Sequence, residues 1–203
     1  MPADFVNAYV LGNIGSTAGI TGACATFLYN LRAAVEDIKS GRCRVAVVGS
    51  SEAPITPEVI DGYAAMSALA TDSDLRNLDG VDSIDYRRAS RPFSSNCGFT
   101  LAESGQYVVL MDDELVLELG AEIYAAVPGV YVNADGYKKS ISAPGPGNYI
   151  TVAKAVALAK NLLGEEVVQN RSFMQAHGSS TPQNRLTESK SFGQVARGYG
   201  FRF

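Results

Sequence analysis

A segment with helical periodicity, followed at once by a short β-branched run, most limits the folds open to this chain. Apolar side chains recur at three- and four-residue steps over residues 28–38, which predicts a helix from about Cys24 to Lys39 that stops at Gly41. The next run, CRVAVVGS at residues 43–50, predicts a strand buried on both sides, as in a parallel or mixed sheet covered by helices. The succession favours a layered α/β fold.

Later segments continue the alternation of strands and helices. Strands are predicted at residues 105–111, at residues 121–135 with an interruption at Pro128 and Gly129, and at residues 172–176. Between the predicted strands at residues 43–50 and 105–111, residues 68–96 are polar, turn-rich and too long for a simple connection. Such long excursions are often functional.

A second helix is predicted after the turn-forming segment SAPGPGN, residues 142–148. Asn148 is a suitable cap for this helix. Its apolar stripe consists of Val152, Val156, Ala159 and Leu163. This helix continues the alternation of strands and helices that is typical of a layered α/β fold.

Composition excludes several classes of protein. The chain has 203 residues, 46% of them apolar and 19% charged, which suits one globular domain or a large piece of one. The net charge of −4 and the lack of a basic cluster argue against a nucleic-acid partner. No apolar run approaches the roughly 18 residues of a membrane span, and no leader is visible at the N-terminus, so we expect a cytoplasmic protein without a membrane partner.

Cysteine and histidine content argues against a metal site. Three cysteines are an odd number without C-x-x-C spacing, and only one histidine is present to join them. A disulfide framework or a zinc site is therefore poorly supported, and we expect no metal. Of the other cysteines, Cys43 is expected to be a packing residue and Cys97 a loop thiol without a catalytic role.

Cys24 lies where the first predicted helix begins. Gly22 and Ala23 leave room around it, and the positive end of a helix dipole lowers the pKa of a thiol, which suits a nucleophile. Cys24 also precedes Leu28 by four residues, on the inward face of the helix, so a small packed core residue is the alternative interpretation.

His177 opens the loop HGSSTPQN, residues 177–184, after a predicted strand. Gly, Ser, Thr and Pro in this loop can hold a side chain at the end of a sheet, where α/β sites are commonly built. A lone histidine is more often a surface or core residue. With Glu188 further along, however, a pair of Cys24 and His177 brought together by folding becomes plausible.

Four segments, in order, match motifs of one family. TGACAT resembles the nucleophile motif, RPFSSNCGFTLAESGQYVVL is similar to R-P-F-D-x-x-R-D-G-F-x-x-G-E-G-A, SAPGPGN resembles T-A-P-x-P, and HGSSTPQNRLTE resembles H-G-T-G-T-P-x-N-D-x-x-E. These are motifs of the β-ketoacyl synthases, the condensing enzymes of fatty acid and polyketide synthesis. The sequence looks closest to the fatty-acid initiation synthases of some bacteria. Departures occur at Asn96 and Cys97, in place of Arg and Asp, at Ala102 in place of Gly, and at Arg185 in place of Asp.

The resemblance implies a thiolase-like layered α/β/α fold. Residues 1–203 are expected to be part of a β-ketoacyl synthase domain, from the nucleophile motif through the first histidine motif. Family members have a long segment before the nucleophile and continue after the glutamate to a Lys, a second catalytic histidine and a Gly-Phe-Gly-Gly loop. We therefore expect an incomplete fold, an internal piece that lacks its N- and C-terminal portions and whose activity alone is uncertain.

The resemblance also implies a decarboxylative Claisen condensation. Cys24 is expected to take an acyl group from coenzyme A or acyl carrier protein as a thioester. Malonyl-carrier protein then loses carbon dioxide, and the carbanion attacks the acyl group. His177 is expected to be one of two histidines that donate hydrogen bonds to the malonyl thioester oxygen. No resident cofactor is implied, because phosphopantetheine thioesters carry the substrates, and the complete protein is expected to be a homodimer.

Five other residues receive supporting roles from the resemblance. Glu188 matches a glutamate that supports the active-site network, with a solvated helix residue as the alternative. Phe99 and Glu103 are expected to shape and hold the site. Ser179 and Thr181 are expected to contact the pantetheine arm, or else to satisfy a turn.

Other classes stay open. A polyketide-type ketosynthase has the same motifs, and a non-catalytic partner subunit of the same fold is a further alternative, although such subunits typically lose the nucleophile. An unrelated Cys–His hydrolase would release a free acid, with no carbon–carbon bond and no carbon dioxide.

Overall fold

The computed structural model describes residues 2–135 and 143–201. They form two compact units. The first unit comprises Met1–Ala53 and Glu103–Val132, and the second comprises Pro54–Ala102 and Asn133–Phe203. The predicted turn at residues 142–148 begins at Ser142, which lies outside the described residues.

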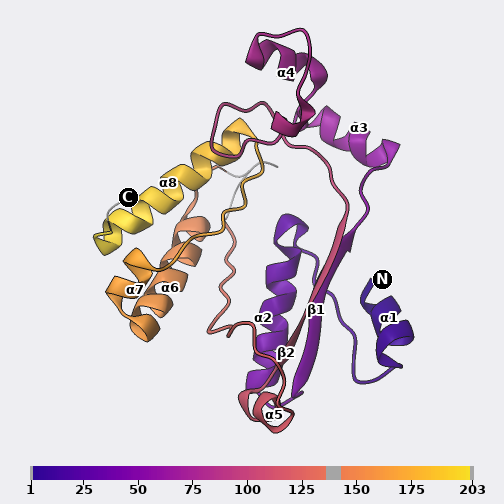
Figure 1. Ribbon diagram of the computed structural model, residues 1–203, viewed down its shortest axis with the longest axis vertical. Helices are drawn as coiled ribbons and strands as arrows, with labels where there is room; N and C mark the ends of the chain where they lie inside the picture. Colours follow the sequence, from indigo (N-terminus) through magenta and orange to yellow (C-terminus); the bar gives the residue numbers. More distant parts are fainter. Residues whose placement is uncertain (1, 136–142, 202–203) are drawn as a thin grey trace. The chain divides into compact units, whose positions relative to one another are not determined.

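The first unit is built on an antiparallel pair of strands, β1 (Val45–Glu52) and β2 (Ser104–Met111). Helix α2 (Thr26–Lys39) packs along this pair (Figure 1). Gly49 lies opposite Tyr107, whose ring occupies the space that a Cβ at residue 49 would need. The other elements of the first unit are α1 (Pro2–Val6), the π-helical turn η1 (Asn7–Leu11), the 3-10 turn η2 (Ala23–Ala25) and α5 (Asp113–Glu118).

An ion pair ties the start of β1 to the end of β2. Arg44 Nε and Nη2 donate to the two carboxylate oxygens of Asp112 at 2.7 and 3.0 Å. Asp112 also caps α5, because its Oδ1 accepts the Leu115 N–H at 2.8 Å. The hydrogen bonds from Arg44 are the main reason why the pKa of Asp112 falls to about 2.

The second unit is helical. Helices α6 and α8 pack on one another and α7 packs on α6 (Figure 1), and the Tyr199 hydroxyl donates to the Ala153 carbonyl at 2.9 Å. The elements of the second unit are α3 (Pro57–Ala65), α4 (Asp72–Asp79), the 3-10 turn η3 (Tyr86–Arg88), α6 (Pro146–Leu163), α7 (Glu165–Asn170) and α8 (Pro182–Tyr199). None of the helices in the described residues is long and apolar enough to cross a membrane.

The predicted helix at residues 24–39 and the strands at 43–50 and 105–111 are confirmed, with α2 beginning at Thr26. The expectation that the first strand is buried on both sides is wrong for this structure, because Val48 is its single buried residue. The polar segment at residues 68–96 contains α4 and η3.

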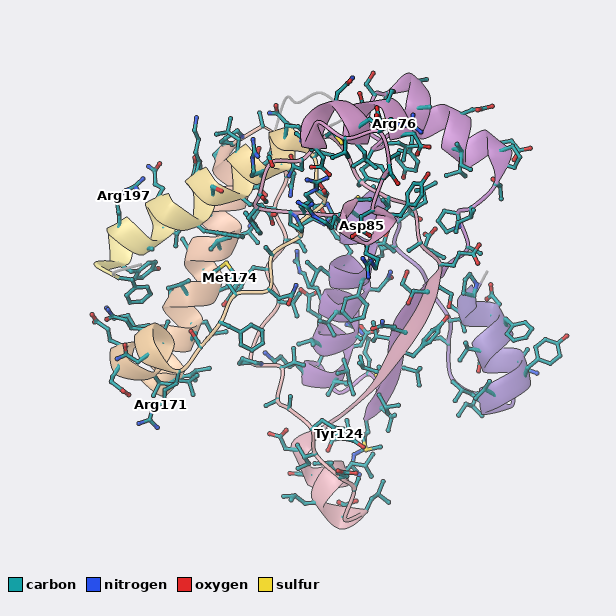
Figure 2. All side chains as sticks on the ribbon, turned by 45° about the horizontal axis from the view of Figure 1, so that its top comes forward. Arg76, Asp85, Tyr124, Arg171, Met174 and Arg197 are labelled. Atoms are coloured by element: carbon teal, nitrogen blue, oxygen red, sulfur yellow. The ribbon has the colours of Figure 1, made fainter. Side chains whose placement is uncertain are left out.

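Two predicted strands, at residues 121–135 and 172–176, are wrong. Both segments lie outside helices and strands, and Figure 2 labels Tyr124 and Met174 on them. Tyr124 is 88% exposed and Phe173 is 89% exposed. Apolar, β-branched sequence predicts that a segment can enter a sheet, but a strand forms only where a neighbour pairs with its backbone, and no strand in the described residues does so.

The predicted cap of α6 is also wrong. Gly145 occupies the N-cap position, and Asn148 lies inside the first turn. Asp135 takes over the role of a cap from a distance in sequence, because its carboxylate accepts the Asn148 backbone N–H at 2.8 Å and the Asn148 side-chain amide at 2.7 Å. A capping residue thirteen positions away is invisible to a local sequence pattern.

Candidate active site

Cys24 lies on the 3-10 turn η2, immediately before α2. Its side chain is exposed, so the expectation that Cys24 shares the inward face of the helix is wrong. The reason is that the α-helical period begins at Thr26, after the cysteine. An exposed thiol beside a helix N-terminus is accessible to an acyl donor.

The backbone around Cys24 is strained and closely held. Ala23 has a φ of 48°, in the left-handed region that a residue with a Cβ rarely adopts. Gly22 donates its N–H to Thr26 Oγ1 at 2.9 Å, and a Cβ at residue 22 would lie 2.6 Å from the Tyr29 ring. The glycine and the strained alanine thus fix the turn that presents the thiol.

The side chain of Asn30, on α2, holds the backbone of Ile20, which precedes this turn. Its Oδ1 accepts the Ile20 N–H at 2.8 Å, and its Nδ2 donates to the Ile20 carbonyl at 3.1 Å and to the Thr26 carbonyl at 2.9 Å. Sequence reasoning missed Asn30, although an amide one turn inside a helix after a glycine-rich loop is a usable signal.

His177 lies on the loop that leads into α8, and the Glu188 carboxylate holds this loop. Glu188 accepts the backbone N–H groups of His177 and Gly178 at 2.7 and 2.8 Å, and the side-chain amide of Asn184 at 2.7 Å. Bonds to an ionised acceptor are stronger than neutral ones. The backbone that carries the exposed His177 side chain is therefore fixed to the first turns of α8.

Thr181 begins α8. Its Oγ1 accepts the Asn184 N–H at 3.2 Å, and Pro182 occupies the first helical position, as is typical of a helix start. Thr181 is only 4% exposed, whereas Ser179 is half-buried, and the two hydroxyls lie 3.2 Å apart. Both hydroxyls satisfy the turn, and contact with a pantetheine arm stays a prediction for both.

Phe99 packs in the second unit. It forms an isolated parallel bridge with Leu69, and its ring meets that of Tyr63 edge-on at 5.0 Å between centroids. Gly98 is required beside it, because a Cβ there would overlap with the Leu69 and Ala70 backbone. Phe99 thus joins the loop at residues 91–99 to the end of α3.

Cys97 has a chemical environment opposite to that of a nucleophile. Burial, and then the negative charge of Asp74, raise the pKa of the Cys97 thiol, so it holds less thiolate at neutral pH.

The structure brings His177, Ser179, Thr181 and Glu188 together around the start of α8. Phe99 belongs to the same unit, whereas Cys24 and the exposed Glu103 belong to the first unit. Asn184 is a residue of this loop that sequence reasoning missed, although it lies in the histidine motif itself.

We expect Glu188→Ala to loosen the His177 loop. The change removes a charged acceptor from two backbone N–H groups, and each such bond contributes about 1.5–3 kcal/mol. Amide hydrogen exchange of a peptide covering residues 172–184 should therefore accelerate about 10- to 100-fold. Glu166→Ala is the matched control, because Glu166 forms an exposed pair with Arg171 at 3.7 Å, which contributes little to stability. Equal exchange in the two variants would show that Glu188 does not hold the loop.

Comparisons with known proteins agree with this geometry. The family model described as "Beta-ketoacyl synthase, N-terminal domain" matches residues 6–115, which include Cys24, Phe99 and Glu103. The β-ketoacyl-[acyl-carrier-protein] synthase FabY of Pseudomonas aeruginosa is 64% identical over 200 residues, which are 98% of this chain and 32% of FabY. The 3-oxoacyl-[acyl-carrier-protein] synthase 2 of Synechocystis is 32% identical over 98% of this chain and 45% of its own length.

The fold agrees as well. The crystal structure of the P. aeruginosa ketosynthase FabY superposes on 99% of this chain with a TM-score of 0.95. The matched region is 32% of the FabY chain. The predicted thiolase-like α/β fold is thereby confirmed for the part of it that these residues form. The chain spans between about a third and a half of the length of the curated relatives it matches.

Proposed function

Because the chain belongs to the β-ketoacyl synthase family, we propose that the complete protein condenses an acyl thioester with malonyl-acyl carrier protein to form a 3-oxoacyl product. The observation that carries the proposal is the 64% identity to a β-ketoacyl-[acyl-carrier-protein] synthase over 98% of the chain, a span that holds both the Cys24 turn and the His177 loop. The pathway we propose is fatty acid biosynthesis.

Cys24 is the proposed nucleophile. Its thiolate attacks the carbonyl of acyl-CoA or acyl-carrier protein and forms an acyl thioester on Cys24 Sγ. The bond from the carbonyl to the carrier sulfur breaks, and the carrier thiolate leaves and takes up the proton that the Cys24 thiol gave up. An exposed thiol on a strained turn at the start of α2 suits this step, because an acyl donor can reach it and the turn fixes its direction.

His177 is the proposed donor for the second half-reaction. When malonyl-carrier protein loses carbon dioxide, the electron pair of the broken carbon–carbon bond forms an enolate, and an imidazole N–H stabilises the negative oxygen. The enolate carbon then attacks the acyl carbonyl and expels the Cys24 thiolate. The supporting role proposed for Glu188 is to fix the backbone that carries His177, and those proposed for Phe99 and Glu103 are to shape the site.

Acyl carrier protein and acyl-CoA are the proposed partners, Ser179 and Thr181 are proposed to contact the pantetheine arm, and the complete protein is proposed to be a cytoplasmic homodimer. The reaction needs no resident cofactor, since both acyl groups arrive as thioesters and no electrons are exchanged with an external acceptor.

The complete synthase should convert acyl-CoA and malonyl-carrier protein labelled in the free carboxylate into 3-oxoacyl product and labelled carbon dioxide in equal amounts. A free acid without carbon dioxide would indicate a Cys–His hydrolase instead. Neither product would indicate a non-catalytic partner subunit. Chain growth through several condensations without reduction would favour the polyketide-type alternative.

A further inference from the structure

Ser180 is buried in the His177 loop in an unusual backbone conformation. Its exposure is 0%, and its φ of 68° lies in the left-handed region. A serine pays for this conformation where glycine would not. The compensation is a hydrogen bond, because Ser180 Oγ accepts the backbone N–H of Arg91 at 2.9 Å.

Arg91 is itself firmly anchored. Its guanidinium donates to both carboxylate oxygens of Asp79, at the end of α4, with distances of 2.6 and 2.9 Å. The two side chains are only 11% and 18% exposed. The carbonyl of Arg91 accepts the Asn96 side-chain amide at 3.0 Å, which closes the loop on itself. The N–H that reaches Ser180 therefore belongs to a rigid backbone.

Two further contacts join the same segment to the His177 loop. Arg185 Nη1 donates to the Ser94 carbonyl. Pro92 lies against Gly178, where its Cβ is 3.2 Å from the position of an added Cβ. Two of the departures from the family motif therefore act on this segment: Asn96 closes the loop on itself, and Arg185 donates to it from α8.

We infer that Ser180 is a positioning residue for His177. Glu188 holds the loop from the side of α8, and the Ser180 hydroxyl holds it from the side of residues 91–96. Together they fix where the His177 imidazole lies. This inference rests on the proposed function, in which His177 donates a hydrogen bond to the malonyl thioester oxygen, and such donation is sensitive to displacements of less than 1 Å.

Two variants of the complete synthase separate the hydroxyl from the backbone strain. Ser180→Ala removes the hydroxyl and keeps the Cβ, whereas Ser180→Gly removes the hydroxyl and also relieves the strain. We expect Ser180→Ala to release carbon dioxide from malonyl-carrier protein about 10- to 100-fold more slowly, and Ser180→Gly, which places the glycine of the H-G-T-G-T-P motif at this position, to lose less of this activity. Acylation of Cys24 by acyl-CoA should proceed at the wild-type rate in both. Exchange of the Arg91 amide should accelerate about fivefold in both.

Ser191→Ala is the matched control. Ser191 lies on α8, is 2% exposed, and its hydroxyl finds no hydrogen-bond partner among the described residues. Its removal should leave both half-reactions and the Arg91 amide unchanged.

The outcomes distinguish the two claims. Wild-type decarboxylation in both Ser180 variants, or an equal loss of both half-reactions, would overturn the positioning role while leaving the proposed function intact. If the wild-type protein performs neither half-reaction, the proposed function fails, and exchange alone decides whether Ser180 holds the loop. An unchanged Arg91 amide in both variants would overturn that role as well.

Discussion

In the complete synthase, we expect His177→Ala to slow carbon dioxide release from malonyl-carrier protein about 100- to 1000-fold, while acylation of Cys24 continues at nearly the wild-type rate. Loss of one donor to a developing oxyanion typically costs this much, because a remaining donor alone stabilises the charge less well. The two half-reactions are measured separately, by release of labelled carbon dioxide and by transfer of a labelled acyl group from acyl-CoA.

A conservative variant sharpens this experiment. His177→Gln keeps an N–H donor at a similar reach, so it should recover part of the decarboxylation that His177→Ala loses. An equal loss of both half-reactions in His177→Ala would mean that the imidazole serves the Cys24 thiol directly.

Cys24→Ala has the opposite effect. We expect it to abolish acyl transfer from acyl-CoA and with it the 3-oxoacyl product, because Cys24 is the proposed acyl acceptor. Decarboxylation of malonyl-carrier protein should persist, since the proposed donor in that step is His177 and not the thiol. The measurement again follows labelled carbon dioxide and the labelled acyl group. His177→Ala and Cys24→Ala should each impair a different half-reaction and leave the other nearly intact.

Cys97→Ala is the control for this variant. Burial and Asp74 raise the pKa of the Cys97 thiol, so it is a poor acyl acceptor at neutral pH and its removal should leave both half-reactions near wild type. Residual 3-oxoacyl product in Cys24→Ala that disappears in the double variant would contradict the assignment of the nucleophile.

The parts of the fold that were predictable are those encoded in local periodicity. Helix α2 has apolar residues at three- and four-residue steps, and strands β1 and β2 contain short continuous apolar runs, and α2 packs on the strand pair. The segments at 121–135 and 172–176 have strand-like composition, but pairing depends on a neighbour that local sequence does not specify.

The candidate site likewise contains residues that the sequence predicts and residues that it does not. Cys24, His177 and Glu188 were found because they lie in motifs, and the structure then explains the glutamate through its bonds to two backbone N–H groups. Ser180 and its contact with Arg91 were not predictable, because 89 residues separate the partners and neither residue type signals the pairing. The predicted placement of Cys24 on the inward face of the helix is wrong, because Cys24 lies on a 3-10 turn and the α-helical period begins only at Thr26.

Location of the acyl group tests the central claim most directly. The complete synthase is incubated with acyl-CoA in the absence of malonyl-carrier protein, digested, and its peptides are analysed by mass spectrometry. The account predicts that the added acyl mass lies on Cys24, in the peptide that contains the turn before α2, because its thiol is exposed at a helix start. Acylation confined to Cys43 or Cys97 would contradict it.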